Sequence, residues 1–170
     1  MVRGNVGGWV YLVSSTYFRM TKLEMAVPRC YFLPTSPGSK FVTLGGAVAN
    51  DVHGKNHHRA GSFGNHVTRF GLVRSDMGEL EVSADSHPEI FAATIGGLGL
   101  TGLITWVEVQ LTTVSSSNVQ EQTKVFNNIE EFFEVEKANR ELFEHTVAWI
   151  DCTTRGSKLG RGIYSGGNWS

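Results

Sequence analysis

The stretch Gly45–His66, "GGAVANDVHGKNHHRAGSFGNH", differs in composition from every other part of the chain. It contains four of the six histidines and five of the 20 glycines. Glycines let a backbone approach a bound group closely, and the asparagine and histidine side chains supply hydrogen-bond donors around it. Because loops rich in glycine and polar groups generally serve a ligand, we expect this stretch to bind one.

Two other interpretations of this stretch stay open. The histidines include an H-x-x-x-H spacing, which would place two imidazoles on one helical face and suit a metal ion, but glycines interrupt that helix. In the other interpretation the histidines only form hydrogen bonds within a polar loop. The residues weighed as metal ligands are His53, His57, His58, His66, Asp51 and Asp76. We assign no metal site on this evidence.

Composition limits the class of protein. A chain of 170 residues with 41% hydrophobic content can bury one core, so one domain, or one domain with a piece of another, is expected. The net charge of -1 provides no electrostatic footprint for nucleic acid. The apolar run Trp9–Val13 is too short to span a membrane, and we expect a soluble cytoplasmic protein. Cys30 and Cys152 lie far apart and are expected to be free, buried thiols.

Local signals predict several elements around the glycine-rich stretch. Thr43 is a candidate N-cap for one or two helical turns over "TLGGAVAND". Phe70–Val82 reads as two β-runs joined by a turn at residues 76–78. In "SHPEIFAAT", Ser86 is a candidate cap for a helix with Pro88 in its first turn.

A second glycine cluster matches the dinucleotide-binding pattern G-x-G-x-x-G at Gly97, Gly99 and Gly102. The Rossmann mechanism needs a strand before these glycines and a helix after them. Here a predicted helix precedes them and a half-buried strand follows, in which Val107 faces the core and Glu108 faces solvent. The Rossmann interpretation is therefore rejected.

The polar run "SSSN" after Val114 predicts a domain boundary. Beyond it, the spacing over residues 127–145 predicts a helix whose one apolar face carries Ile129, Phe132, Phe133, Leu142 and Phe143. "TVAWID" then reads as a strand, and the final "GRGIYSGGNWS" is expected to add no element. A second α+β unit would thus begin here without being completed.

Two long segments carry a resemblance to a known family. "FLPTSPGSKFVTLGGAVANDVHGKNHHRAGSFGNHV" followed by "IFAATIGGLGLTGLIT" resembles the FAD-binding domain of FAD-linked oxidases of the vanillyl-alcohol oxidase type, and most closely a bacterial branch of these enzymes. The resemblance runs from Leu23 to Val114 and continues more weakly through "HTVAWIDC". It implies an α+β fold, with part of a PCMH-type FAD-binding domain followed by the start of an α+β substrate domain.

The resemblance implies that the chain is a truncated portion of a larger enzyme and that it has three parts. Residues 1–22 would be a divergent or unrelated segment, because they do not match the family's upstream pyrophosphate loop. Residues 23–115 would be the FAD-binding domain, incomplete at its N-terminal side. Residues 116–170 would be the incomplete beginning of the substrate-binding domain.

The resemblance also implies site residues. His53 matches a histidine beside the isoalloxazine ring and Lys55 a lysine facing the substrate pocket, so these two are the candidate catalytic residues. The implied cofactor-binding residues are Gly38, Thr43, Leu44, Gly45, Gly46, Asn50, Asp51, Val52, His53 and Ile104.

The function implied by the resemblance is FAD-dependent oxidation of an alcohol group in a sugar or sugar-derived substrate, lipid-linked substrates included, by hydride transfer to the flavin. The larger enzyme could then associate with a membrane. Two alternatives remain open: a non-catalytic remnant of such an enzyme, and a histidine-rich metal-binding module. The residues do not indicate which group removes the hydroxyl proton.

Overall fold

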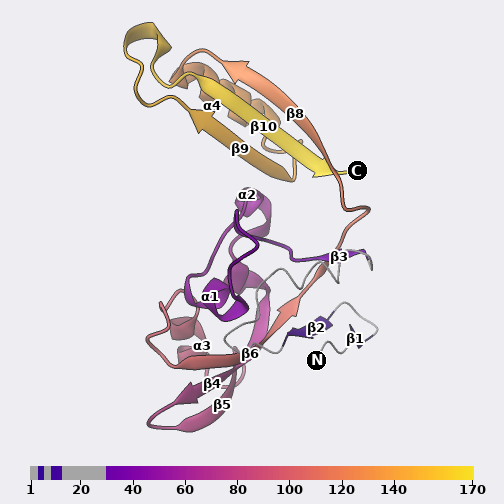
Figure 1. Cartoon of the computed structure of the whole chain (residues 1–170), viewed down its shortest axis with the longest axis vertical. Helices are drawn as coiled ribbons and strands as arrows, with labels where there is room; N and C mark the ends of the chain where they lie inside the picture. The colour runs from indigo at the N-terminus through magenta and orange to yellow at the C-terminus, as the bar shows by residue number, and fades with distance from the viewer. Residues whose placement is uncertain (1–3, 6–8, 13–29) are drawn as a thin grey trace. The chain divides into compact units, whose positions relative to one another are not determined.

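A computed structural model describes residues 4–5, 9–12 and 30–170, and the chain divides into two compact units, Met1–Val114 (unit 1) and Ser115–Ser170 (unit 2) (Figure 1). Both units combine helices with antiparallel sheets, so the predicted α+β class is confirmed. Most of the predicted divergent segment 1–22, and the predicted start of the FAD-binding domain at residue 23, lie outside the described residues.

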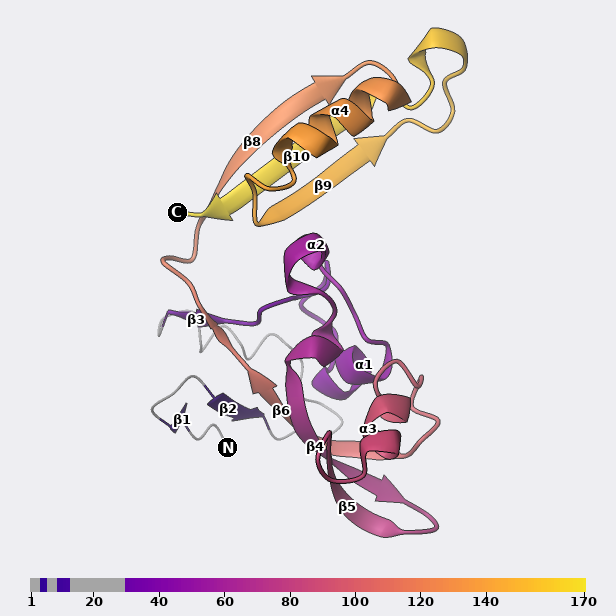
Figure 2. The same ribbon diagram turned by 180° about the vertical axis from the view of Figure 1, so that it is seen from behind.

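Unit 1 is built on a five-stranded antiparallel sheet with the strand order β1-β2-β6-β4-β5. Helix α1 contacts β6 and helix α3 contacts β5 (Figures 1 and 2). A separate two-stranded ladder joins β3 to β7. The elements of unit 1 are β1 (Gly4–Asn5), β2 (Trp9–Leu12), β3 (Tyr31–Phe32), α1 (Leu44–Ala49), α2 (His57–Ala60), a 3₁₀ turn (Phe63–His66), β4 (Val67–Arg74), β5 (Gly78–Ser83), α3 (Pro88–Thr94), β6 (Leu103–Gln110) and β7 (Thr112–Thr113).

The core of unit 1 lies between α1 and the sheet, with Leu44, Val48 and Phe70 fully buried. The predicted hairpin is confirmed, since β4 and β5 pair antiparallel across the turn. The predicted exposure of Glu108 is wrong, because only 7% of this residue is exposed. Arg69, its partner in the β4–β6 register, covers it and binds its carboxylate.

Helix α3 starts at Pro88 as predicted, but Ser86 does not cap it. The N-cap is His87, which adopts a left-handed backbone with φ of 59° and makes no side-chain cap bond. Ser86 belongs to the preceding turn, where its backbone N–H donates to Ser83 Oγ at 3.0 Å. The cap prediction failed because a tight turn at the end of β5 uses this serine.

Unit 2 is a three-stranded antiparallel sheet in the order β8-β10-β9, with α4 packed on one face (Figure 2). Its elements are β8 (Val119–Phe126), α4 (Ile129–Asn139), β9 (His145–Ile150), a 3₁₀ turn (Gly156–Lys158) and β10 (Gly162–Trp169). The strand predicted at "TVAWID" is confirmed, whereas the final residues, expected to add no element, form the central strand. Their glycines suit this position because a Cβ on Gly166 would lie 2.2 Å from the Phe143 ring.

The predicted apolar face over residues 129–143 is only partly present. Helix α4 ends at Asn139, so Leu142 and Phe143 lie beyond it. Phe132 packs against a core of Phe126, Phe143 and Tyr164, whereas Phe133 is 60% and Leu142 63% exposed. The helix is shorter than its apolar spacing predicted because the chain turns after Asn139 into β9.

Two further observations bear on the cell-biological expectations. Both cysteines are free, but both are exposed, so their predicted burial is wrong: Cys30 lies in the turn before β3 and Cys152 in the loop after β9. No helix among the described residues has the length and apolarity needed to cross a membrane.

Candidate functional site

Helix α1 begins at a side-chain cap that the sequence predicted. Thr43 Oγ1 accepts a hydrogen bond from the backbone N–H of Gly46 at 3.0 Å. A Cβ on Gly46 would lie only 2.8 Å from that oxygen, so the cap and the glycine depend on each other. Leu44 is fully buried in the core, so neither its side chain nor its backbone is exposed to a ligand in this structure.

The end of α1 holds two other segments of the predicted site. Gly96 N–H donates to Val48 O at 3.0 Å, and Leu98 N–H donates to Ala49 O at 2.8 Å. On another side, Gly64 N–H donates to Asp51 Oδ1 at 2.8 Å. The fold therefore brings together the three motifs, "TLGGAVAND", "AGSFGNH" and "TIGGLGL", that are separate in sequence.

A fourth segment is attached through Asn56, one of the asparagines expected to supply donors to a ligand but not predicted as a site residue. Its side-chain Nδ2 donates to Pro34 O at 2.6 Å, and its Oδ1 accepts from Thr35 Oγ1 at 3.3 Å. Gly54 lies against the same segment, residues 34–36, because a Cβ on Gly54 would approach Ser36 O to 2.3 Å. No local signal distinguishes Asn56 from its exposed neighbours, since it precedes the short polar helix α2.

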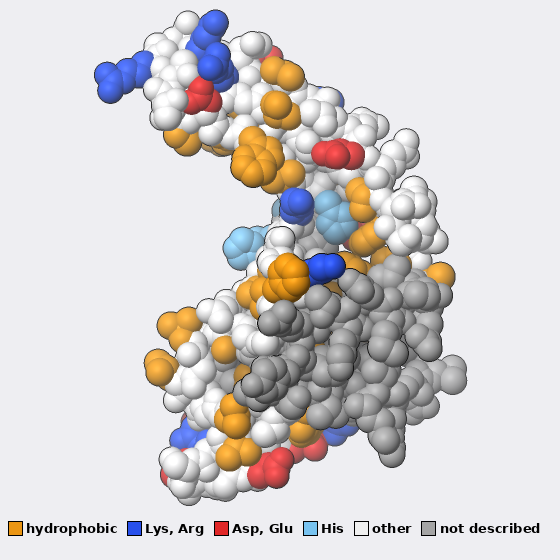
Figure 3. Space-filling view, viewed as in Figure 1, with side chains coloured by type: hydrophobic (Ala, Val, Ile, Leu, Met, Phe, Trp, Pro, Cys, Tyr) orange, Lys and Arg blue, Asp and Glu red, His pale blue; other side chains and the backbone are white. Residues whose placement is uncertain are grey.

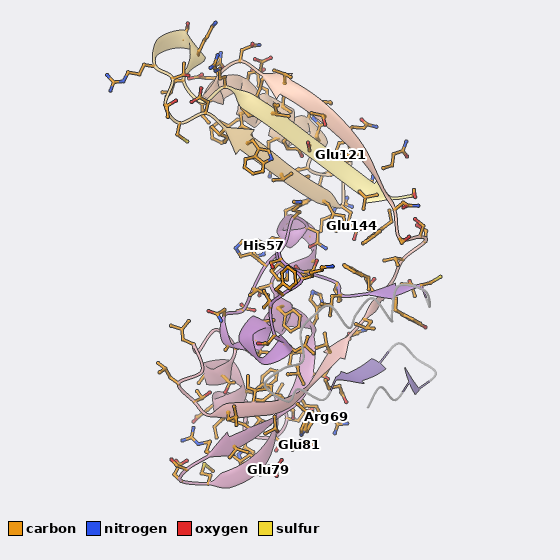
Figure 4. The ribbon with its side chains drawn as sticks, in the orientation of Figure 1. His57, Arg69, Glu79, Glu81, Glu121 and Glu144 are labelled. Carbon is orange, nitrogen blue, oxygen red and sulfur yellow. The ribbon has the colours of Figure 1, made fainter. Side chains whose placement is uncertain are left out.

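The candidate catalytic residues lie at the surface. His53 and Lys55 are both exposed, and the rings of His53 and His57 are 5.3 Å apart between centroids at an interplanar angle of 56°. Figure 3 shows histidine side chains at the surface over α2, and Figure 4 shows His57 projecting from that helix. His66 has a structural contact instead, with Nε2 2.8 Å from Ala60 O.

The other predicted cofactor residues have varied surroundings. Asn50 is exposed and its Nδ2 donates to Gly46 O at 2.9 Å, while Val52 packs against the core. Gly38 is exposed, and a Cβ there would meet no described atom within 4 Å. Gly45 is half-buried within α1. Ile104 is half-buried in β6 opposite Leu72, so it belongs to the sheet rather than to the turn before it.

The histidines do not form a metal cluster. Within residues 30–170 and the described N-terminal strands, no group of three or more His, Cys, Asp or Glu side chains is placed to hold a metal ion.

The elements on either side of the second glycine cluster follow in the order that the sequence predicted, since α3 precedes Gly97 and β6 follows Gly102. A pyrophosphate at a following helix N-terminus, as in a Rossmann fold, is thus ruled out at these glycines.

The chain is similar in sequence to an oxidase, as its motifs predicted. One oxidase to which it is similar is decaprenylphosphoryl-beta-D-ribose oxidase of Mycolicibacterium smegmatis, with 35% identity over 149 residues, which are 86% of this chain and 32% of that protein. The chain is also 38% identical over 141 residues to a Streptomyces coelicolor protein described as an uncharacterized protein in the mprA 5' region, covering 82% of this chain and 37% of that protein. No protein-family model matches the chain. It spans about a third of the length of these curated relatives.

Proposed function

We propose that the chain forms the FAD-binding part, and the start of the substrate-binding part, of an FAD-dependent oxidoreductase that oxidises a CH–OH group. The observation that carries this proposal is the convergence of separate glycine-rich motifs at the end of α1, through the bonds of Gly64, Gly96 and Leu98. The match to an oxidase over most of the chain supports it. Residues 23–115 would belong to the PCMH-type FAD-binding domain and residues 116–170 to the substrate domain.

The residues present suit a planar, polar cofactor. Among the segments that meet at α1, Gly96 and Gly99 are exposed and not tightly packed, so backbone groups there can approach a ligand without a side chain between them. Exposed Asn50 and His53 add side-chain donors beside this backbone. The proposed contacts to FAD come from Gly38, Thr43, Gly45, Gly46, Asn50, Asp51, Val52, His53 and Ile104, whereas Leu44 is fully buried and is not proposed to contact it.

The chemistry divides between cofactor and protein. FAD, when bound, accepts the hydride from the alcohol carbon. His53 would hydrogen-bond the ring or the substrate and so orient one against the other. Lys55 would hold an anionic or hydroxylated group of the substrate by charge-assisted hydrogen bonds. Both side chains are exposed, so each can reach a bound molecule without displacing core residues.

For the substrate we propose a sugar or sugar-derived alcohol, lipid-linked substrates included. This proposal rests on the name of the Mycolicibacterium relative, which acts on a decaprenylphosphoryl-linked ribose. Association of the complete enzyme with a membrane would follow from such a substrate.

The cofactor proposal is tested by titrating FAD with the purified chain and following flavin fluorescence. We expect weak but saturable binding, because residues 1–22 do not match the family's pyrophosphate loop. Binding should weaken further in His53→Ala but not in the control Asn118→Ala, an exposed asparagine of unit 2. Saturation by stoichiometric zinc, with no response to FAD, would favour the metal-binding alternative.

Catalysis is tested in a hybrid enzyme, in which the matching segment of this chain replaces that of the Mycolicibacterium oxidase. A hybrid that folds, retains FAD and oxidises the substrate of its parent supports the proposed function. A folded hybrid that neither retains FAD nor turns over would identify the segment as a non-catalytic remnant.

A further inference from the structure

Asn56 is buried in a segment whose neighbours are exposed. Only 3% of its surface is accessible, whereas Lys55 and His57 on either side are both exposed. Asparagine is rarely buried unless its amide is hydrogen-bonded, because an unpaired amide loses its contacts with water. The burial of Asn56 therefore requires the partners that the fold supplies.

Those partners come from a segment more than 20 residues earlier in the chain. Pro34 O accepts from Nδ2 at 2.6 Å, and Thr35 Oγ1, itself 1% exposed, donates to Oδ1 at 3.3 Å. The amide thus uses one donor and one acceptor on two consecutive residues. Only a side chain with both functions on a short stem satisfies this pair.

This attachment lies beside the two candidate catalytic residues. Asp51, bound to Gly64 N–H, fixes the chain before His53, and Asn56 fixes it directly after Lys55. Gly54, between the two, lies against Ser36 O. His53 and Lys55 consequently project from a short loop held at both ends.

We propose that Asn56 is a positioning residue, whose buried amide sets the directions in which His53 and Lys55 face a ligand. The role of those two side chains rests on the proposed function, whereas their placement by Asn56 is independent of it. The affinity for FAD should then depend on the Asn56 amide, although this amide is buried and does not itself contact FAD.

The experiment uses the 170-residue chain with Asn56→Ala, Asn56→Asp and the control Asn65→Ala. Asn65 is exposed, and its Oδ1 accepts from Ser62 N–H at 2.9 Å within one turn, so its loss leaves the attachment to Pro34 intact. Histidine ring signals are followed by NMR, with the contact between His53 and His57 as the readout. The signal of His66 is the internal reference.

We expect the contact between the two rings to be lost in Asn56→Ala and kept in Asn65→Ala, with His66 unchanged in Asn56→Ala. The FAD Kd should rise about tenfold in Asn56→Ala, which corresponds to about 1.4 kcal/mol. Asn56→Asp adds a chemical rescue: a protonated carboxyl can donate to Pro34 O and accept from Thr35, but a carboxylate cannot donate. The ratio of the Asn56→Asp Kd to the wild-type Kd at the same pH should fall toward one as the pH is lowered. The same ratio for Asn56→Ala should stay constant.

A lower melting temperature with an unchanged ring contact and an unchanged FAD Kd would overturn the proposal, because that is the result of a purely structural role. If the ring contact is lost in Asn56→Ala as expected but the wild-type chain does not bind FAD, the positioning role is retained and the proposed function is rejected. If Asn56→Ala does not fold, Thr35→Val removes only the hydroxyl donor to Oδ1 and decides by the same readouts.

Discussion

The Asp51 carboxylate accepts a hydrogen bond from the backbone N–H of Gly64 at 2.8 Å, across 13 residues of the chain. Asp51 adopts a left-handed backbone with φ of 41°, which is uncommon outside glycine but tolerated by aspartate. The turn directs the chain from the end of α1 toward His53, and the bond holds the loop that returns. One side chain therefore relates the position of His53 to the "AGSFGNH" motif.

Gly64→Ala should destabilise unit 1. The added Cβ would lie 2.4 Å from Ile95 Cγ2 and 2.9 Å from Asp51 Oδ1, so the loop must move away from both. Overpacking of this kind costs about 1–3 kcal/mol. Urea unfolding measures the loss, with Gly38→Ala as the control, because a Cβ on Gly38 meets no described atom within 4 Å. Equal stability of the two variants would contradict the close approach of Gly64 to Asp51.

Glu108→Ala should also destabilise unit 1, because Glu108 is the buried centre of a polar network on the sheet. Its Oε2 lies 2.9 Å from Arg69, its Oε1 accepts from Thr68 at 2.5 Å, and Arg69 also reaches Glu81 at 2.7 Å (Figure 4). Removal leaves a partly buried guanidinium without its main partner, at a cost of about 1.5–3 kcal/mol.

The control for Glu108→Ala is Asp76→Ala, which removes an exposed carboxylate from Arg74 at the hairpin turn. The Arg74 hydrogen bond lowers the pKa of Asp76, but an exposed ion pair contributes little to stability. Chemical unfolding should therefore separate the two variants. A larger loss of unfolding free energy in Asp76→Ala than in Glu108→Ala would contradict the buried contacts of Glu108 with Arg69 and Thr68.

Unit 2 should lose stability in acid through Asp151. Hydrogen bonds from Thr154 and Thr153 hold the pKa of Asp151 well below the ordinary value of 3.8. Because the folded-state pKa is the lower one, the stabilisation is fully present above pH 3.8 and is lost as the pH falls below it. Asp151→Asn should lower stability at neutral pH and flatten the acid limb of the stability curve. An acid limb as steep as that of wild type would assign the effect to other carboxylates.

His53→Ala and Lys55→Ala should separate in the hybrid enzyme. Loss of Lys55 removes charge-assisted contacts of about 1.5–3 kcal/mol each, so turnover per bound flavin should fall while flavin content stays normal. Loss of His53 should also change the flavin spectrum or the retention of the cofactor. Activity normalised to bound flavin is the measurement. An unchanged value for both variants would remove these residues from the active site.

Local signals predicted much of the site's framework. The Thr43 cap, the β4–β5 hairpin and the order of α3 before Gly97 each depend on a few neighbouring residues, so the sequence determines them directly. The resemblance of the same segments to FAD-linked oxidases was likewise readable from the sequence and is confirmed by the oxidase relative.

Burial and the pairing of distant segments were decided only by the tertiary structure. Asn56 looks like another polar loop residue until Pro34 and Thr35 are brought against it. Glu108 fits the exposed face of a half-buried strand until Arg69 covers it from β4. The glycines of β10 resemble a loop until the Phe143 ring occupies the space above Gly166. In each case the deciding contact comes from a residue more than 20 positions away, and no local periodicity carries that information.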